Sequence, residues 1–179
     1  MRFERSSIPE IGRLLGVLVA QRPGGRFAEI GTGVGVGSAW IVDSLGPEGV
    51  FVTVELDADR AAAASRLFAD HSNVRVLHGD WHDLLSDEAP FDLLFFDGGA
   101  WKRRPSDEVG RESRAALELV APAGIVVIDD LVPEGQWQDE RRGRPDPVRE
   151  FWLNQADLAA TEVLTTPEAA AILAVKKVV

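Results

Sequence analysis

The sequence predicts a doubly wound α/β fold in which helices cover both faces of a seven-stranded sheet, mostly parallel with an antiparallel hairpin at its C-terminal end. Three observations support this fold class. Runs rich in β-branched and aromatic residues alternate with segments of helical periodicity. Several of these runs are apolar throughout, which is typical of strands buried on both faces of a parallel sheet. Two further runs near the C-terminus are joined by a link too short for a crossover, which favours an antiparallel pair.

Each element follows from its local pattern. The five runs predicted to form parallel strands are residues 26–30, 50–55, 74–78, 91–96 and 124–128. The helical segments between them are residues 36–45, 57–70, 81–86 and 106–121. An amphipathic helix over 8–21 is predicted before the first strand, with Ser7 and Glu10 forming a capping box. Alternation of strands and helices in this way builds right-handed βαβ units.

The C-terminal part of the chain has a different pattern. The polar stretch 132–146 shows no periodicity, so we predict a mobile surface loop and a candidate lid. Asp146 is the expected cap of a helix that begins at Pro147 and runs to about residue 155. The two runs of the predicted hairpin are residues 160–164 and 169–176.

Length and composition favour one domain. The chain has 179 residues, of which 45% are hydrophobic, enough for one substantial core and too few for two domains of ordinary size. We therefore expect a single domain over residues 1–179. Its expected parts are an N-terminal helix within 1–25, a central core over 26–131, the loop 132–146, and the helix and hairpin over 147–179.

Charge and cysteine content exclude several classes of protein. The formal net charge of -10 argues against nucleic acid as a partner, because nonspecific binding to phosphates needs a positive surface. The absence of cysteine excludes disulfides and thiolate metal sites and fits a reducing cytoplasm. Arg2 and Arg5 precede the apolar run 14–20, but this run belongs to the amphipathic helix and is shorter than a membrane span of about 20 residues. We expect a soluble cytoplasmic protein with no membrane partner.

An acidic residue ends or follows each of the five predicted parallel strands. In strand order these residues are Glu29, Glu55, Asp80, Asp97 and the pair Asp129 and Asp130. In open α/β sheets, ligands bind beyond the carboxyl ends of the strands, where the strand order reverses. The acidic side chains should therefore converge on a ligand site. The alternative is that each carboxylate only caps the helix that follows its strand.

A glycine-rich turn, residues 31–35, follows the first strand. A dinucleotide-binding turn requires glycines at relative positions one, three and six, and this spacing fails whether counting starts at Gly31 or at Gly33. The Gly-Lys-Ser/Thr sequence of a phosphate-binding loop is also absent. What remains is a tight turn whose bare backbone lets a ligand lie across the junction of strand and helix. Glu55, at the end of the second strand, is placed to accept hydrogen bonds from a ribose diol.

Taken in order, these motifs resemble class I S-adenosylmethionine-dependent methyltransferases. The residues that carry the resemblance are Glu29-x-Gly31-x-Gly33-x-Gly35, Val54 to Asp57, His78 to Trp81, Phe91 to Asp97 and Gly124 to Asp130. Each motif is degenerate, but the ordered set, which spans about residues 26–131, is specific. The resemblance implies a Rossmann-like fold with a cofactor-binding core at 26–131, and the terminal hairpin fits that fold.

The resemblance also implies which residues bind S-adenosyl-L-methionine. The glycine turn would face the methionine part of the cofactor, Glu55 would hold the ribose hydroxyls, and Leu56 and Trp81 would flank the adenine, whose amino group Asp80 would meet. The full implied cofactor set is Glu29, Gly31, Thr32, Gly33, Gly35, Glu55, Leu56, Asp80, Trp81 and Asp97. A carboxylate-rich pocket suits a ligand that carries a sulfonium and an ammonium. Trp81 as an ordinary core residue is the alternative.

Within this superfamily, the segment from Asp97 to Lys102 with the later acidic pair resembles catechol- and caffeoyl-CoA-type O-methyltransferases. The resemblance implies that Asp97, Asp129 and Asp130 hold Mg2+ or another divalent cation, and that Asp97 and Lys102 are catalytic, with Lys102 as general base. The sequence departs from that pattern by two extra residues before Lys102 and by Asp130, where Asn is usual. The alternatives are a solvated Lys102 and an acidic pair that binds no metal.

The leading functional hypothesis is therefore methylation of a small hydroxylated molecule at oxygen, with S-adenosylmethionine as methyl donor and a divalent cation as candidate cofactor. An NAD(P)-dependent oxidoreductase is disfavoured by the glycine spacing. A non-catalytic domain that binds the cofactor or a partner protein stays open. The short segment before the first strand predicts an acceptor site that is either open or completed by a partner subunit, as in a homodimer. Trp137, in the loop, either covers the acceptor or packs locally.

Overall fold

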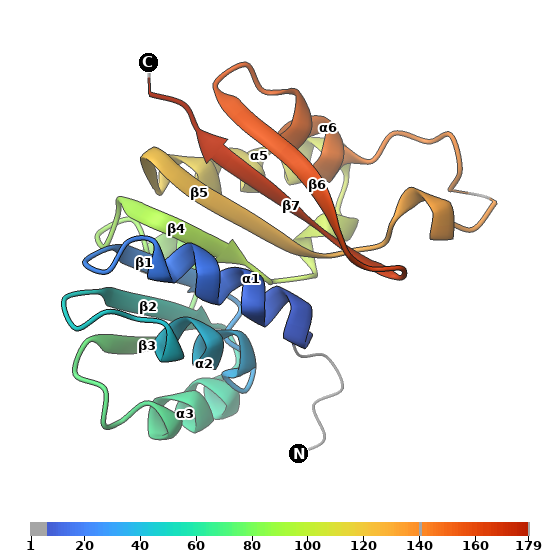
Figure 1. Cartoon of the computed structure of the whole chain (residues 1–179). Coiled ribbons are helices and arrows are strands. Elements are labelled where there is room, and N and C mark those ends of the chain that lie inside the picture. Colours follow the sequence, from blue (N-terminus) through green and yellow to red (C-terminus); the bar gives the residue numbers. More distant parts are fainter. Residues whose placement is uncertain (1–6, 140, 179) are drawn as a thin grey trace.

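The computed structural model describes residues 7–139 and 141–178, which form a seven-stranded sheet with helices on both faces (Figure 1). The strands are β1 (Arg26–Ile30), β2 (Val50–Glu55), β3 (Val74–His78), β4 (Phe91–Phe96), β5 (Val120–Leu131), β6 (Leu158–Thr166) and β7 (Ala169–Lys176). The helices are α1 (Pro9–Ala20), α2 (Val36–Asp43), α3 (Ala58–Leu67), α4 (Trp81–Leu84), α5 (Ser106–Glu118) and α6 (Pro147–Asn154), with 3-10 turns η1 (Trp101–Arg103) and η2 (Glu134–Gln136).

The strand order is β3-β2-β1-β4-β5-β7-β6, and β1 to β5 are all parallel. The chain builds outward from β1 to β3 and then returns to place β4 on the other side of β1. The order therefore reverses between β1 and β4, which is the position where doubly wound sheets bind ligands beyond the carboxyl ends of their strands. The fold class predicted from the sequence is confirmed, including the antiparallel pairs of β7 with β5 and β6.

Two apolar layers hold the helices on the sheet. On one face, α1 and α2 pack through residues such as Ile11, Leu15 and Ile41 against the rings of Phe27 and Phe95. On the other face, α5 and α6 contribute a second cluster that contains the fully buried side chain of Trp152. Figure 1 shows α1, α2 and α3 on one side of the sheet and α5 and α6 on the other. Burial on both faces explains why the central strands are apolar throughout.

The start of α1 differs from the prediction. Its N-cap is Ile8, and no side chain caps the helix, so the predicted capping box of Ser7 and Glu10 is wrong. Pro9 occupies the first turn, where its missing N–H would have had no partner and its fixed φ suits a helix. The Ser7 hydroxyl instead donates to Asp97 Oδ2 at 3.4 Å. The opening residues 1–6, with Arg2 and Arg5, lie outside the described residues.

The boundary between α5 and β5 also differs from the prediction. The helix ends at Glu118, and β5 begins at Val120 instead of residue 124. Pairing between strands explains the early start, because Phe91 of β4 is opposite Val120 and donates its N–H to the Leu119 carbonyl at 2.8 Å. A sequence window cannot detect this pairing, which joins segments far apart in the chain. Helix α3 likewise ends at Leu67, before the predicted residue 70.

Asp146 caps α6 as predicted, accepting from the N–H groups of Val148 and Arg149, with Pro147 in the first turn. The segment before it folds on itself around Trp137, which is 5% exposed and does not line the cavity described below. Trp137 therefore packs locally, outside the cavity lining. Within 7–139 and 141–178, no helix combines the length and apolar character that a membrane span requires.

Candidate active site

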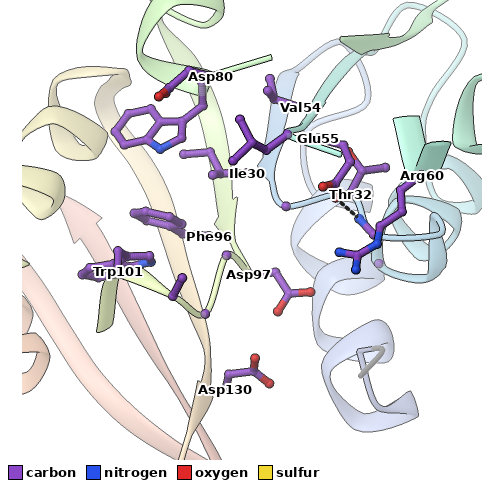
Figure 2. A pocket seen from close by; sticks show the side chains of 18 of the residues that line it. Ile30, Thr32, Val54, Glu55, Arg60, Asp80, Phe96, Asp97, Trp101 and Asp130 are labelled. Carbon is purple, nitrogen blue, oxygen red and sulfur yellow. Dashed lines mark hydrogen bonds between the residues drawn. The ribbon is translucent and has the colours of Figure 1, made fainter. Parts of the chain in front are cut away.

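A cavity of about 530 Å3 lies at the carboxyl ends of the central strands, at the reversal of strand order between β1 and β4. Figure 2 shows its walls: Phe96 and Trp101 lie on one side, Glu55 and Arg60 on the other, and Asp97 and Asp130 at one end. The lining is therefore aromatic on one side and carboxylate-rich elsewhere. Such a cavity can hold a flat aromatic group together with a positively charged group.

The glycine turn needs glycine for steric reasons. Gly31, Gly33 and Gly35 have φ values of 99°, 56° and 92°, in the left-handed region that other residues rarely adopt. A Cβ atom at Gly31 would lie 2.9 Å from the backbone nitrogen of Gly98, which follows β4. The turn and the end of β4 thus approach each other at backbone contact distance. A ligand placed there meets main-chain groups on both sides.

Glu55 lies at the end of β2 with both carboxylate oxygens in use. Oε2 accepts from the Gly33 N–H at 2.7 Å (Figure 2), and Oε1 accepts from the Asp57 N–H at 2.9 Å. The residue is 7% exposed and lines the cavity. Each carboxylate oxygen has a second lone pair, so Glu55 can also accept hydrogen bonds from a ligand. Glu55 does not cap α3, because Asp57 does so by accepting from the Arg60 N–H.

Glu29 is completely buried behind the cavity wall. Its Oε2 accepts hydrogen bonds from Ser38 and Thr53, while its Oε1 has no partner. Thr53 is in turn hydrogen-bonded to Thr32 of the glycine turn, with 2.5 Å between the hydroxyl oxygens. Burial raises the pKa of the Glu29 carboxyl from 4.5 to about 8. Glu29 therefore ties α2 and β2 to the turn from beneath instead of lining the cavity.

This raised pKa predicts a pH dependence of stability. In the unfolded chain the carboxyl of Glu29 loses its proton near pH 4.5, and in the folded protein near pH 8. The folded state holds the extra proton between these values, so the stability from Glu29 is complete below 4.5 and is lost as pH rises through about 8. We expect the Glu29→Gln variant to gain free energy of unfolding relative to wild type over this window. Denaturant unfolding at stepped pH measures the difference, and parallel curves would contradict the assignment.

Gly37, two residues beyond the glycine turn, leaves room for this buried carboxylate. A Cβ atom at position 37 would lie 2.5 Å from Glu29 Oε1 and 2.9 Å from the ring of Phe95. Gly37 also lines the cavity. Its absence of a side chain lets the first turn of α2 lie directly on β1 and β4.

Replacing Gly37 by Ala should therefore destabilise the protein, although alanine normally favours a helix by about 1 kcal/mol over glycine. We expect a net loss of about 1–3 kcal/mol, because the overpacked site lies against a buried carboxylate and a ring. Urea unfolding measures it. The matched control is Gly110→Ala in α5, where a Cβ atom would meet nothing within 4 Å and a small gain in stability is expected. Equal effects of the two substitutions would contradict the steric account.

Aromatic rings form one wall of the cavity. Phe96 stacks on Trp101 with ring centroids 4.5 Å apart, and Trp81 meets Phe96 edge to face at 5.7 Å. Trp81 lines the cavity and also packs against the apolar core, so a role beside a ligand and a role as a core residue are compatible. Leu56, 74% exposed, lines the cavity as well. The wall can thus pack against the face or edge of a flat ligand group.

Asp80 has the capping role that was the simpler alternative for the acidic residues. It is the N-cap of α4 and accepts from the N–H of His82 at 3.0 Å and from its Nδ1 at 2.7 Å. These hydrogen bonds lower the pKa of Asp80. His82 Nε2 also lies 3.3 Å from Glu112, which pairs with Arg104 at 3.1 Å. Asp80 therefore has both roles considered for the acidic residues at strand ends: it caps α4 and it lines the cavity.

Asp97, Asp129 and Asp130, here called the acidic trio, meet at the end of the cavity. Each offers one carboxylate oxygen, and these oxygens all lie within 4.8 Å of one another. Burial, followed by the charges of Asp129 and Asp130, raises the pKa of Asp97 to about 7. Burial also raises the pKa of Asp129 to about 6; the Asp130 N–H opposes this shift through a hydrogen bond, and the charge of the Asp130 carboxylate adds to it. The trio is thus a cluster of hard oxygen ligands whose charges repel one another.

A bulge in β5 explains how two consecutive residues join the trio. Ile128 pairs with Ile172 and Leu131 pairs with Ala170, so β5 has one more residue than β7 between these two pairs. Asp130 takes the left-handed conformation, with φ of 59°, which aspartate tolerates better than most residues. In a regular strand, consecutive side chains would point to opposite faces. The bulge brings both carboxylates within reach of Asp97.

Lys102 is directed at the trio and not at solvent. Its Nζ donates a hydrogen bond to the Asp129 carbonyl oxygen, and burial lowers the pKa of its ammonium while the three carboxylates oppose this shift. Lys102 lies in the 3-10 turn η1, and Trp101 at the start of this turn stacks on Phe96. Arg103 and Arg104 of the same basic run are exposed. The solvated interpretation therefore fits the two arginines but not Lys102.

Most of the site residues expected from the sequence lie together. Those that line the cavity are Gly31, Thr32, Gly33, Glu55, Leu56, Asp80, Trp81, Asp97 and Asp130, while Glu29, Gly35, Lys102 and Asp129 are not part of this lining. Sequence reasoning missed Ser7, Phe96, Trp101 and Glu112 as lining residues. Phe96 and Trp101 belong to motifs named in the sequence analysis, so a signal for them existed. Ser7 precedes α1 and Glu112 lies in α5, and only the fold brings these segments near the cavity.

Comparisons with known proteins agree with this architecture. A methyltransferase domain family matches residues 28–131, more than half of the chain. The chain therefore belongs to the methyltransferase domain family, as the resemblance of its ordered motifs predicted.

Three proteins similar to this chain are described as O-methyltransferases or proposed O-methyltransferases. The Bacillus cereus O-methyltransferase in complex with S-adenosylhomocysteine has a TM-score of 0.77 and 26% identity, covering 98% of this chain and 84% of that one. TomG of Streptomyces achromogenes, involved in tomaymycin synthesis and solved with S-adenosylmethionine, has a TM-score of 0.75 and 29% identity, covering 97% and 82%. A proposed O-methyltransferase of Mycobacteroides abscessus is 28% identical over 147 residues, covering 78% of this chain. The chain spans 54–65% of the length of the first curated relatives.

Proposed function

We propose that the protein is an S-adenosylmethionine-dependent methyltransferase that methylates a hydroxyl oxygen of a small molecule. The observation that carries the proposal is the cavity at the β1–β4 reversal, bounded by the glycine turn, the Glu55 carboxylate and the aromatic wall. The two structural neighbours above were solved with S-adenosylhomocysteine and S-adenosylmethionine. The failed dinucleotide spacing of the turn argues against an oxidoreductase that binds NAD(P).

In this proposal each wall of the cavity takes one part of the cofactor. The ribose hydroxyls donate to Glu55, the adenine packs against Trp81 and its neighbouring rings, and the methionine part lies along the glycine turn. The sulfonium and ammonium gain from the carboxylates of Asp97 and Asp130. Asp80 and Leu56 border the adenine end. Glu29 supports the turn from behind, and Gly35 ends the turn as the N-cap of α2.

The acidic trio fits a divalent cation on its chemistry. Mg2+ and Ca2+ prefer carboxylate oxygens, and three are gathered within 4.8 Å of one another. Burial is the main cause of the raised pKa values of Asp97 and Asp129, and the charges of neighbouring carboxylates add to it; a bound cation would offset this cost of holding them ionised. Asp97, Asp129 and Asp130 would hold the ion, which when bound supplies Lewis-acid polarisation of an acceptor oxygen.

The chain's own residues supply positioning and the proton acceptor. The Lys102 amine, whose pKa burial lowers, lies against the trio and takes the proton of the acceptor hydroxyl. The acceptor oxygen attacks the methyl carbon while the carbon–sulfur bond breaks, which leaves a neutral thioether. The aromatic wall and the glycine turn hold the donor, so that the reaction gains mainly from proximity and orientation.

Release of S-adenosylhomocysteine from a panel of hydroxylated acceptors tests this function. We expect turnover that depends on the acceptor, favours compounds with two adjacent hydroxyls over their monohydroxylated analogues, and stops when EDTA removes Mg2+. Turnover that is unchanged by EDTA would contradict the cation part of the proposal. Binding of the cofactor with no transfer to any adjacent-diol or monohydroxylated acceptor would favour the non-catalytic alternative.

A further inference from the structure

Outside the cavity, the most elaborate polar network of the described residues surrounds Arg149 of α6. Its side chain is 8% exposed and donates to Glu162 of β6 through Nε and Nη2, both at 2.7 Å. Its Nη1 donates to Asp146 Oδ2 at 3.0 Å. Burying a guanidinium is costly unless its donors are paired, and here two carboxylates compensate the charge. Because these hydrogen bonds fix the Arg149 side chain, any further group that it binds is held in place as well.

Arg141 also pairs with Asp146, and the network further contacts the carbonyl oxygen of Val132. Arg149 Nη2 donates to it at 2.9 Å, and Trp137 Nε1 donates to the same oxygen, also at 2.9 Å. The Arg149 guanidinium in turn lies 5.2 Å from the centroid of the Trp137 ring, with Arg141 at 4.5 Å from that centroid. Both lone pairs of one carbonyl are thus bound by two donors that also contact each other. We call Arg149 and Trp137 the Val132 clamp.

The clamp lies immediately after the bulge that shapes the acidic trio. Val132 is two residues beyond Asp130, which has the left-handed conformation, and one beyond Leu131, where β5 resumes its pairing with Ala170. On the strand side, the bulge is held by the pairing of Ile128. On the other side, Leu131 pairs with Ala170, and the clamp fixes the carbonyl of the next residue, Val132, where the chain leaves the sheet.

We propose that Arg149 and Trp137 are positioning residues for the acidic trio. By fixing the Val132 carbonyl, they hold the β5 bulge in the conformation that turns Asp129 and Asp130 toward Asp97. This inference rests on the proposed cation site, and it adds to that site two residues that touch neither cofactor nor cation. The segment after β5 then serves as the support of the trio, in place of the lid predicted from its polarity.

Two variants separate positioning from folding. Trp137→Phe keeps an aromatic ring near the two arginines and removes the Nε1 donor, whereas Arg149→Lys keeps a charge and loses the forked geometry. The matched control is Arg22→Lys: Arg22 pairs with Asp92 and donates to the Ala123 carbonyl at 3.3 Å, near the opposite end of β5. We expect the two clamp variants to bind Mg2+ about 3-fold to 100-fold more weakly than wild type in calorimetric titration. Their S-adenosylmethionine affinity should stay within about 2-fold, as should the Mg2+ affinity of the control.

A metal-free measurement separates failure of the clamp from failure of the cation site. Backbone amide NMR shifts of residues 129–131 in the metal-free protein should change in Trp137→Phe and not in Arg22→Lys. Wild-type Mg2+ affinity with unchanged amide shifts in the clamp variants would overturn the inference. So would a parallel loss of Mg2+ and S-adenosylmethionine affinity, since that indicates general destabilisation. Absence of Mg2+ binding in wild type would overturn the cation site, and changed amide shifts would then show that the clamp still fixes the bulge.

Discussion

The Glu55→Ala variant is expected to bind S-adenosylmethionine at least about 100-fold more weakly than wild type. The substitution removes the proposed acceptor of both ribose hydroxyls. It also removes the partner of the Gly33 N–H, which Glu55 Oε2 accepts at 2.7 Å, so the glycine turn loses a link to β2. Two charge-assisted hydrogen bonds, each contributing about 1.5–3 kcal/mol, account for a loss of this size. Calorimetric titration of the cofactor into the two proteins measures it.

A neighbouring carboxylate provides the control for this prediction. Asp57 is joined to Glu55 through its own N–H and caps α3, yet it does not line the cavity. Asp57→Ala should cost about 1 kcal/mol of stability through the lost cap and leave cofactor affinity nearly unchanged. Equal losses of affinity in the two variants would mean that the β2–α3 junction matters only through its fold, and that Glu55 is not the ribose ligand.

The Asp129→Asn variant should lose at least about 100-fold in turnover and nevertheless be more stable than wild type. Burial and the charge of Asp130 raise the pKa of Asp129 to about 6, so near pH 7 the folded protein holds a carboxylate in unfavourable surroundings. The neutral amide removes this penalty, and we expect a gain of about 1 kcal/mol in the free energy of unfolding. A residue kept against its stability cost is a sign of function.

Asp130→Asn is the comparison for Asp129→Asn. The residue is exposed, and asparagine is usual at the matching position of the catechol- and caffeoyl-CoA-type enzymes that the sequence resembles. We expect it to keep most of its turnover. Acceptor assays at saturating Mg2+ and urea unfolding of both variants give the two quantities. If Asp129→Asn turned over at the wild-type rate, the trio would have no part in the reaction.

Local sequence was sufficient to predict the fold, because the apolar composition of the central strands indicates that they are buried. The run Phe91–Phe96 has five buried residues out of six, and its pattern admits only a strand covered on both faces. The hairpin was predicted from the length of the link alone, since residues 165–168 are too few to cross over a sheet. The family followed from the order of motifs at successive strand ends, and the domain match over 28–131 confirms it.

The details of the site depended on contacts between distant segments. Ser7 fits a helix-cap pattern, yet it contacts Asp97, because the proline at position 9 begins the helix without a cap. Asp129 and Asp130 are adjacent in sequence, and their convergence on Asp97 requires a bulge that local propensity does not encode. The polar sequence around Trp137 predicted only a mobile loop, because Arg149, which contacts the Trp137 ring and the Val132 carbonyl, lies on the following helix.

Calorimetric titration of the wild-type protein with S-adenosylmethionine, and separately with NADH, tests the central claim most directly. The glycine turn, Glu55 and the aromatic wall predict one saturable site for S-adenosylmethionine and no saturable binding of NADH. Saturable binding of NADH with no response to S-adenosylmethionine would contradict the account.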